Sequence, residues 1–309
     1  MATTTGGFAT LLAPGLRKVM FNAINAQPNQ FLSVFNISDS TRAYEDDAKI
    51  SGLGSMVSKA EGTNTTFDDP LTPLTRRYTH GSYGLGFRVT REMYDDDLYN
   101  IMKRMAAELG RAASYKVEID AWSILNNAFS AATAAMQGFD GLQLVSTAHT
   151  RMDGGSTMAN RPSTDVDFSY TAYQAALDHF NTLVDDRGRP IVMEPKLLIV
   201  SPSFEWAARE IFGSEYKPYT ANNEINPLKS GSVEWMTSRY LTDDDSWFLL
   251  ANKRQGEEGN GHDLNFTWRT RPETAEADDF MSGDALFKIF ARYVPGFGEW
   301  RGVYGSSGG

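Results

Sequence analysis

Between residues 76 and 129, the spacing of apolar residues changes from every second position to every third or fourth. The first part alternates aromatic and branched residues with polar residues and glycines, as in a β-strand: Tyr78, His80, Tyr83, Leu85, Phe87 and Val89. In the second part, the apolar residues share one face of a helix from about Glu92 to about Phe129: Leu98, Ile101, Met102, Met105, Leu109, Ala112, Ala113, Ile119 and Trp122. Such a helix would be roughly 50–55 Å long. We expect the stripe containing Ile101, Met105 and Leu109 to pack on the chain's own sheet.

Three glycines interrupt the predicted strand, at Gly81, Gly84 and Gly86. They fall inside the strand alternation and do not form the GxGxxG or GxxxxGKS/T spacing of a phosphate-binding loop. Glycines inside strands mark a bulge, a bend or the close approach of another backbone. We therefore assign these glycines a structural role.

The N-terminal part of the chain contains little that could form a core of its own. A short helix is predicted with Pro14 in its first turn and Pro28 beyond its end, and its apolar residues share one side: Leu16, Val19, Met20, Ala23 and Ile24. Residues 44–87 then form two extended segments separated by a polar tip that contains Pro70 and Pro73. We interpret these residues as a long protruding hairpin. Because it lacks a core, it would gain stability by lying on another subunit.

The second half of the chain mixes helices and strands. One apolar face predicts a helix that ends at the segment DDRGRP: Tyr173, Ala176, Leu177, Phe180, Leu183 and Val184. The strand KLLIV is followed by a helix that begins near Ser201 or Ser203. The remaining strands are separated by polar loops: SVEWMTSRYL, SWFLLAN, LNFTWRT, FKIFARYV and EWRGVYG. The whole pattern predicts an α+β protein without internal repeats.

Composition excludes several classes of protein. The chain has 309 residues, of which 41% are hydrophobic, and this is enough for a sizeable core. It contains no cysteine, which excludes disulfides, thiolate metal sites and cysteine nucleophiles. A formal net charge of −10 argues against tight coating of nucleic acid. We also expect neither a membrane-spanning segment nor a cleaved signal peptide, since no apolar run is long enough.

No pattern in the sequence marks an active site. The four histidines lack a second ligand at helical spacing: His80, His149, His179 and His262. Of these, His80 is expected to form a hydrogen bond in a core or an interface. The acidic runs Asp95–Asp97 and Asp243–Asp245 lack the calcium-loop pattern, and the first is better explained by a helix start, where carboxylates are favourable. No GxSxG motif is present, and the basic pairs are interpreted as solvated faces or intersubunit ion pairs: Arg76, Arg77, Lys103 and Arg104. We predict no catalytic, cofactor-binding or metal-binding residue.

Four stretches of the sequence resemble the major capsid proteins of tailed bacteriophages, which share the Hong Kong 97-type shell fold: RRYTHGSYGLGFRVTREMYDDDLY, DDRGRPIVMEPKLLIVSPSFEWAAREIFGS, NNEINPLKSGSVEWMTSRYLTDDDSWFLLAN and FARYVPGFGEWRGVYGS. The resemblance covers nearly the whole chain. It implies an α+β capsid fold with an N-terminal arm, an extended β-hairpin loop, a peripheral domain with a long spine helix, and an axial domain. By resemblance, these parts are the arm at 1–43, the extended loop at 44–87, the peripheral domain at 88–149 and 264–296 with the spine at 92–129, and the axial domain at 150–263 and 297–309.

The sequence departs from this family in two respects. Some members carry a long, charged, helical scaffolding segment before the arm. Here the arm begins almost at once, so scaffolding is either a separate protein or a segment removed from this chain. Some members also join subunits by an isopeptide bond between lysine and asparagine. The predicted extended loop contains Lys49 and Lys59, but no asparagine follows Asn265, so we expect this cross-link to be missing.

The resemblance implies a structural protein that is not an enzyme and needs no cofactor. Copies would assemble into hexamers and pentamers of an icosahedral head that encloses double-stranded DNA, with weak contacts to the DNA and none to a membrane. Separate scaffolding, portal and decoration proteins would be partners. The particle would assemble as a procapsid in the cytoplasm of the host bacterium and mature into the virion. Two alternatives stay open, an encapsulin-like nanocompartment shell and a soluble hydrolase.

Overall fold

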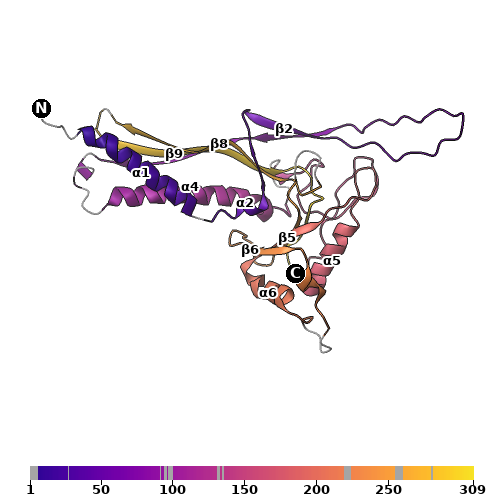
Figure 1. The fold of residues 1–309 in the computed structure, drawn as a ribbon. Helices are drawn as coiled ribbons and strands as arrows, with labels where there is room; N and C mark the ends of the chain where they lie inside the picture. Colours follow the sequence, from indigo (N-terminus) through magenta and orange to yellow (C-terminus); the bar gives the residue numbers. More distant parts are fainter. Residues whose placement is uncertain are drawn as a thin grey trace.

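The computed structural model describes residues 6–26, 28–90, 92–93, 96, 100–130, 133, 136–218, 224–254, 260–279 and 281–309. Figure 1 shows a long layer of helices and strands, a more compact part that contains the C-terminus, and a hairpin that projects beyond both. Within the described ranges, no helix is both long and apolar enough to cross a membrane.

A four-stranded sheet forms one layer of the long part, in the order β1–β8–β9–β4. Its strands are β1 (Asn36–Asp39), β4 (Gly81–Val89), β8 (Leu264–Asp278) and β9 (Ala285–Phe297). β9 pairs antiparallel with both β8 and β4, whereas β1 is parallel to β8. A Cβ atom on Gly86 would lie 2.7 Å from the carbonyl oxygen of Phe287 in β9. The close approach of a second backbone therefore explains this strand glycine.

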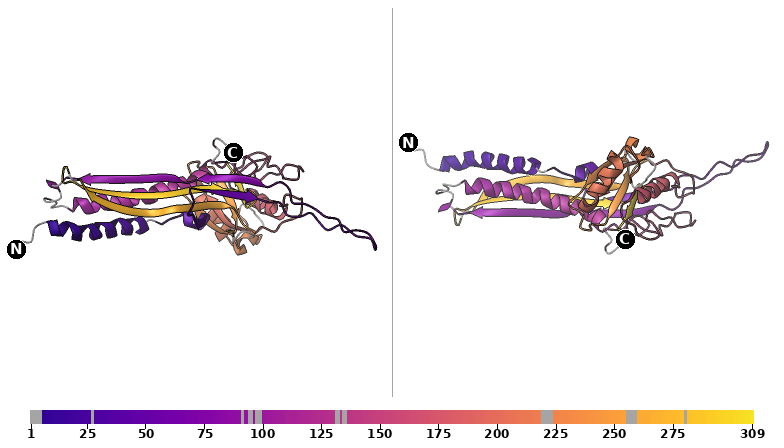
Figure 2. Two further views of the ribbon diagram at one scale, coloured as in Figure 1. Left: turned by 90° about the horizontal axis from the view of Figure 1, so that it is seen from above. Right: turned by 90° about the horizontal axis from the view of Figure 1, so that it is seen from below.

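Two long helices, α1 (Gly6–Ala26) and α4 (Ile101–Asn126), cover one face of this sheet, as the two views in Figure 2 show. α1 is longer than the sequence predicts. It starts at Gly6, so Pro14 lies inside the helix and not in its first turn. A short helix, α2 (Phe31–Val34), follows before the chain enters β1.

The predicted spine helix is too long at its N-terminal end. Glu92 and Met93 are helical, but α4 begins only at Ile101, after Asn100 adopts a left-handed conformation with φ of 54°. No acidic residue occupies the first turn of α4. The expectation that the acidic run opens this helix is therefore wrong, and Asp95 and Asp97 lie outside the described residues.

The buried face of α4 also differs from the predicted stripe. Ile101 and Ile119 are exposed and Met105 is only half-buried. The buried positions combine large and small side chains: Met102, Ala106, Leu109, Gly110, Ser114, Val117, Glu118, Ala121, Trp122, Ile124 and Leu125. The reason is that α4 packs on α1 as well as on the sheet. Small residues allow the two helices to approach closely, and a search for large apolar side chains does not detect them.

The compact part is built on a second sheet with the strand order β10–β7–β5–β6. Its elements are α5 (Tyr170–Asn181), β5 (Pro195–Val200), η2 (Pro202–Phe204), α6 (Glu205–Gly213), η3 (Pro227–Ser230), β6 (Glu234–Thr237), β7 (Trp247–Ala251) and β10 (Val303–Ser306). Leu198 and Val200 share a core with α5 and α6. Ile199 and Phe248 share a second core with Trp122 of α4. One face of this sheet thus packs on the helices of the compact part, and the other joins the compact part to the end of α4.

The projecting hairpin consists of β2 (Tyr44–Lys49), β3 (Leu74–Thr79) and the intervening residues 50–73, which contain no strand. The two strands are antiparallel, with Tyr44 opposite Thr79 and Lys49 opposite Leu74. The hairpin is shorter than the predicted 44–87 because the residues from Gly81 onward pair with β9. Its outer part extends well beyond the rest of the molecule (Figure 2).

Candidate assembly interface

Residues 50–73 of the hairpin are mostly exposed along their length. Their large apolar side chains are exposed as well: Ile50, Leu53, Met56, Val57 and Phe67. Exposed apolar side chains that gather on one segment are typical of a surface that another molecule covers. The sequence pattern indicated the missing core, but it predicted a polar tip, whereas the tip also carries exposed apolar side chains.

A turn at residues 185–189, within the segment DDRGRP, holds the root of the hairpin. Arg187 Nη2 donates a hydrogen bond to the carbonyl oxygen of Asp69 at 2.6 Å, and Arg187 Nε donates to that of Gly52 at 3.3 Å. The same guanidinium lies 3.6 Å from the carboxylate of Asp68. Arg187 therefore ties together both sides of the hairpin. The sequence gives no signal for this contact, because its partners lie more than 100 positions away.

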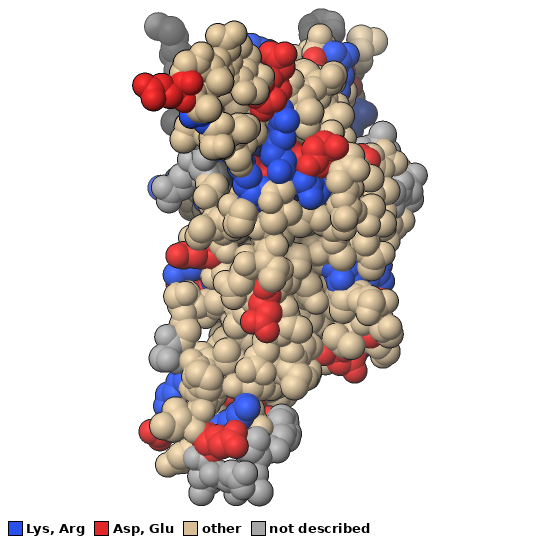
Figure 3. Space-filling model, turned by 90° about the vertical axis from the view of Figure 1, so that its right-hand side faces the viewer, with Lys and Arg blue, Asp and Glu red and all other residues tan. Residues whose placement is uncertain are grey.

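Four charged side chains form a closed ring beside this turn. Lys49 Nζ lies 2.8 Å from Asp186 Oδ2 and also contacts Glu299. Arg301, only 3% exposed, binds Asp186 at 3.0 Å and Glu299 at 2.9 Å. Burial alone would raise the pKa of Asp186, but Lys49 and Arg301 outweigh burial and lower that pKa. The charge ring of Lys49, Asp186, Glu299 and Arg301 thus fixes the hairpin root to the compact part. Figure 3, seen from the side of the hairpin tip, shows basic and acidic side chains lying next to one another on this face.

Three of the four histidines lie in separate places and do not form a common site. His80 is buried, and its Nε2 lies 3.3 Å from Ser40 Oγ, in agreement with the expected hydrogen bond. His179 lies beside the ring of Tyr304, and burial lowers its pKa to about 4. Burial also lowers the pKa of His262 to about 4. Among the residues that the structure describes, no three His, Cys, Asp or Glu side chains are grouped so as to hold a metal ion.

The fourth histidine, His149, belongs to a buried polar network. Its Nδ1 lies 2.6 Å from Asp140 Oδ2, and its Nε2 lies 3.1 Å from Asn160 Oδ1. The side-chain amide of Asn160 donates to two backbone carbonyl oxygens, and the imidazole stacks on Trp300 with ring centroids 4.2 Å apart. His149 is fully buried. The network therefore connects segments of the core and offers no surface to a ligand.

The basic pairs and the second acidic run have structural partners or face solvent. Arg77 makes a two-pronged ion pair with Asp46 across the hairpin. The guanidinium of Arg76 lies over the rings of Tyr78 and Phe297. The run at 243–245 is a turn closed by a hydrogen bond between its first and third residues. The remaining basic pair is exposed on α4: Lys103 and Arg104.

The residues considered for an isopeptide bond lie in different places. Lys49 is held in the charge ring, whereas Lys59 is exposed in the projecting loop. Asn265 lies on β8, where its Nδ2 donates to Asp263 Oδ1 at 2.9 Å and its Oδ1 accepts from Asn36 at 3.3 Å. Within one subunit these side chains do not meet.

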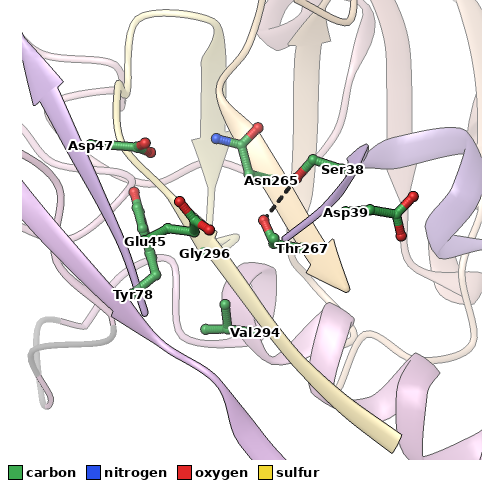
Figure 4. Close-up of a pocket in the computed structure, with 9 residues that line it drawn as sticks. All are labelled: Ser38, Asp39, Glu45, Asp47, Tyr78, Asn265, Thr267, Val294 and Gly296. Carbon is green, nitrogen blue, oxygen red and sulfur yellow. Dashed lines mark hydrogen bonds between the residues drawn. The ribbon is translucent and has the colours of Figure 1, made fainter. Parts of the chain in front are cut away.

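A pocket of about 290 Å³ lies between the hairpin strands β2 and β3 and the first sheet (Figure 4). Its lining is mostly polar or acidic: Ser38, Asp39, Glu45, Asp47, Tyr78, Asn265, Thr267, Val294 and Gly296. Glu45, Asp47 and Tyr78 stand on the hairpin side of the pocket. Asp39, on the opposite side, is paired with Arg271 at 2.9 Å. The pocket is thus lined by residues of the hairpin and of the first sheet, which are far apart in the sequence.

The description "Phage capsid protein" belongs to the family whose model matches residues 73–306. The match runs from the return strand of the hairpin to the last strand, so it includes most of both sheets, the spine helix and every charge-ring residue except Lys49. The chain belongs to the phage capsid protein family. This capsid protein is accordingly a major shell protein of the bacteriophage virion, as the sequence predicts.

Solved capsids share the fold of this capsid protein at low sequence identity. The capsid of cyanophage P-SCSP1u aligns with a TM-score of 0.60 and 9% identity over 90% of this chain and 88% of that one. The capsid of bacteriophage JBD30, decorated with minor capsid protein trimers, aligns with a TM-score of 0.54 and 16% identity over 70% and 91%. The SrpI encapsulin of Synechococcus elongatus gives 0.53 and 10% over 91% and 88%. No curated protein matches the sequence. The Hong Kong 97-type fold predicted from the resemblance is confirmed.

Proposed function

We propose that this capsid protein assembles into hexamers and pentamers of an icosahedral head that encloses double-stranded DNA, and that its hairpin binds a neighbouring copy. The observation that carries the proposal is a firmly rooted hairpin whose apolar side chains lie in water in a single subunit. Covering Met56 and Phe67 with a neighbour would remove apolar surface from water. Because every copy carries the same hairpin, the contact is repeated around a closed shell.

The proposal includes a division of the chain into four parts. The parts are an arm at 1–43, an extended loop at 44–79, a peripheral domain at 80–149 and 264–296, and an axial domain at 150–263 and 297–309. Moving residues 80–87 from the loop to the peripheral domain is supported by the pairing of β4 with β9. The shared core around Trp122 supports a stiff connection between the peripheral and axial domains.

The partners follow from the capsid family and from the charge of the subunit. The JBD30 capsid carries trimers of a minor capsid protein, and we infer a decoration protein here too, together with separate scaffolding and portal proteins. A subunit with a formal charge of −10 would touch packaged DNA weakly and without sequence preference. The protein would act without catalysis or cofactor, and the particle would assemble in the cytoplasm of the host bacterium before it matures.

Assembly of the purified protein tests the proposal directly. Analytical ultracentrifugation and electron microscopy should show closed particles, whereas a soluble hydrolase would sediment as a small oligomer. The double variant Met56→Ser/Phe67→Ser should stay folded and soluble but lose its shells, because it removes only exposed apolar surface. Thr65→Ser/Thr66→Ser changes the same segment without removing large apolar side chains and serves as the control. Closed shells of unchanged stability from the first variant would show that the hairpin is not an assembly element.

An encapsulin-like compartment is the second candidate, because the fold matches an encapsulin as well as it matches the JBD30 capsid, with TM-scores of 0.53 and 0.54. The contents of native particles separate the two functions. A phage head should yield double-stranded DNA of uniform length. A cargo enzyme bound inside DNA-free particles would instead identify a nanocompartment.

A further inference from the structure

The hydroxyl of Tyr78 is buried without a hydrogen bond. The residue is 8% exposed, and its Oη has no partner among the residues that the structure describes. The ring is held in place by Gly296, where an added Cβ would lie 2.5 Å from a ring carbon. A buried hydroxyl that lacks a partner destabilises a protein, and natural proteins contain few of them. The tyrosine lines the pocket at the hairpin root (Figure 4).

Two half-buried carboxylates of the hairpin, Glu45 and Asp47, line the same pocket, and Glu45 also accepts a hydrogen bond from Ser40 Oγ. Glu45 stands directly opposite Tyr78 in the hairpin register, and Asp47 lies on the same face of β2. Burial, followed by the charges of Asp263 and Glu45, raises the pKa of Asp47, although Arg254 and Arg76 oppose this shift. A cation beside Asp47 would offset both the burial and the negative neighbours that disfavour its ionised form.

We propose that this pocket receives the ammonium or guanidinium group of a basic side chain from a second copy of the chain, with Glu45, Asp47 and the Tyr78 hydroxyl as its hydrogen-bonding partners. The inference rests on the proposed function, because the cation arrives only when copies assemble. An N–H of the cation would donate to Tyr78 Oη while the Tyr78 O–H donates to a carboxylate. Burial raises the pKa of Tyr78, so the hydroxyl keeps the proton that it would donate.

The pocket fits an organic cation better than a metal ion. Its volume of about 290 Å³ can hold the end of a lysine or arginine side chain. No three metal-binding side chains are grouped within the described part of the chain. The pocket also lies at the root of the hairpin, next to the segment proposed to bind a neighbour. A basic side chain seated there would add a buried ion pair to that contact.

The test compares the same substitutions in the unassembled subunit and in the shell. Tyr78→Phe and Asp47→Asn should leave the urea midpoint for unfolding of the subunit unchanged or raised. The first removes a buried hydroxyl without a partner, and the second removes a half-buried carboxylate whose ionised form is disfavoured by burial. In the shell both groups have a partner, so the urea concentration that dissociates half of the shells should fall for both variants. Asp46→Asn, on the opposite face of the same strand, is the control. It should not combine an unchanged or raised urea midpoint of the subunit with a lower urea concentration for dissociation of the shell.

Equal shifts in the subunit and the shell, or an unchanged shell, would overturn the inference. A wild-type shell that weakens on addition of EDTA, when Asp47→Asn shells do not, would identify a metal ion as the occupant and would also overturn it. Failure of the wild-type protein to assemble at all would contradict the proposed function itself. Normal wild-type assembly, with shell stability unchanged in the variants, would contradict only the proposed cation site.

Discussion

A Cβ atom on Gly110 of α4 would lie 2.5 Å from the backbone carbonyl oxygen of Met20 in α1 and 3.1 Å from the Cβ of Ala23. No real Cβ atom occupies such a position without displacement of the facing backbone. Ala106, one turn earlier on α4, is fully buried in the same contact. These two small residues set the distance between the helices, and thereby the position of α1 on the long layer.

Gly110→Ala should destabilise the subunit by about 1–3 kcal/mol, because the added methyl group forces the two helices apart. This cost should exceed the gain of about 1 kcal/mol from the higher helix propensity of alanine. Gly15→Ala is the matched control, since nothing lies within 4 Å of its added Cβ in α1. The control should gain about 0.5–1 kcal/mol. Urea unfolding of both variants checks the prediction, and a stabilised Gly110→Ala protein would contradict it.

Arg301→Met should lower the free energy of unfolding by about 3–5 kcal/mol, because it leaves the buried carboxylate of Asp186 and the partly buried carboxylate of Glu299 with only Lys49 to compensate them. Arg209→Met is the control. Arg209 pairs with Glu205 on the exposed surface of α6, so its loss should cost less than about 1 kcal/mol. Chemical unfolding measures both values. Equal losses for the two variants would mean that the charge ring contributes no more than a surface ion pair.

Acid should weaken the subunit partly through His179. Its pKa is lowered by burial from 6.5 to about 4, so the unfolded chain binds a proton more readily than the folded protein does. This contribution to stability is complete above pH 6.5 and is lost as the pH falls towards 4, by up to about 1.4 kcal/mol per pH unit. His179→Phe should be tolerated at pH 7.5, because Nε2 has no hydrogen-bond partner in the described part of the chain.

Urea unfolding at pH 7.5, 6 and 5 should show a shallower loss of stability for His179→Phe than for the wild-type protein. A residual slope is expected, since the pKa of His262 is also lowered to about 4. Identical slopes for the two proteins would show that His179 does not titrate between these pH values.

Mature particles should contain no covalent links between subunits. The absence of cysteine excludes disulfides, Lys49 is held in the charge ring, and the amide of Asn265 is hydrogen-bonded on both sides. Particles boiled in detergent should therefore give one band near 34.2 kDa. A ladder of dimers, pentamers and hexamers would contradict this expectation, and mass spectrometry of the ladder would identify the joined side chains.

The spine helix α4 shows which buried residues a sequence pattern predicts and which it misses. The apolar spacing predicted a long helix and correctly included Leu109 and Trp122 among its buried residues. It wrongly favoured Ile101 and Ile119, which are exposed. A stripe of large side chains indicates one contact surface, but α4 has two, and its contact with α1 depends on Ala106 and Gly110. Periodicity does not reveal which helix will lie against a small residue.

By itself, the sequence determined the local structure and the family of this protein. The alternation and spacing of apolar residues predicted β4 and most of α4, and the lack of core residues predicted the hairpin. Four sequence stretches indicated a capsid protein. Only the tertiary structure decided that Arg187 clamps the hairpin, that Lys49 closes a ring with Asp186, Glu299 and Arg301, and that Tyr78 meets Glu45 and Asp47 in a pocket. The physical reason is separation along the chain. Periodicity results from short-range geometry, whereas a charge ring depends on where folding brings residues more than 100 positions apart.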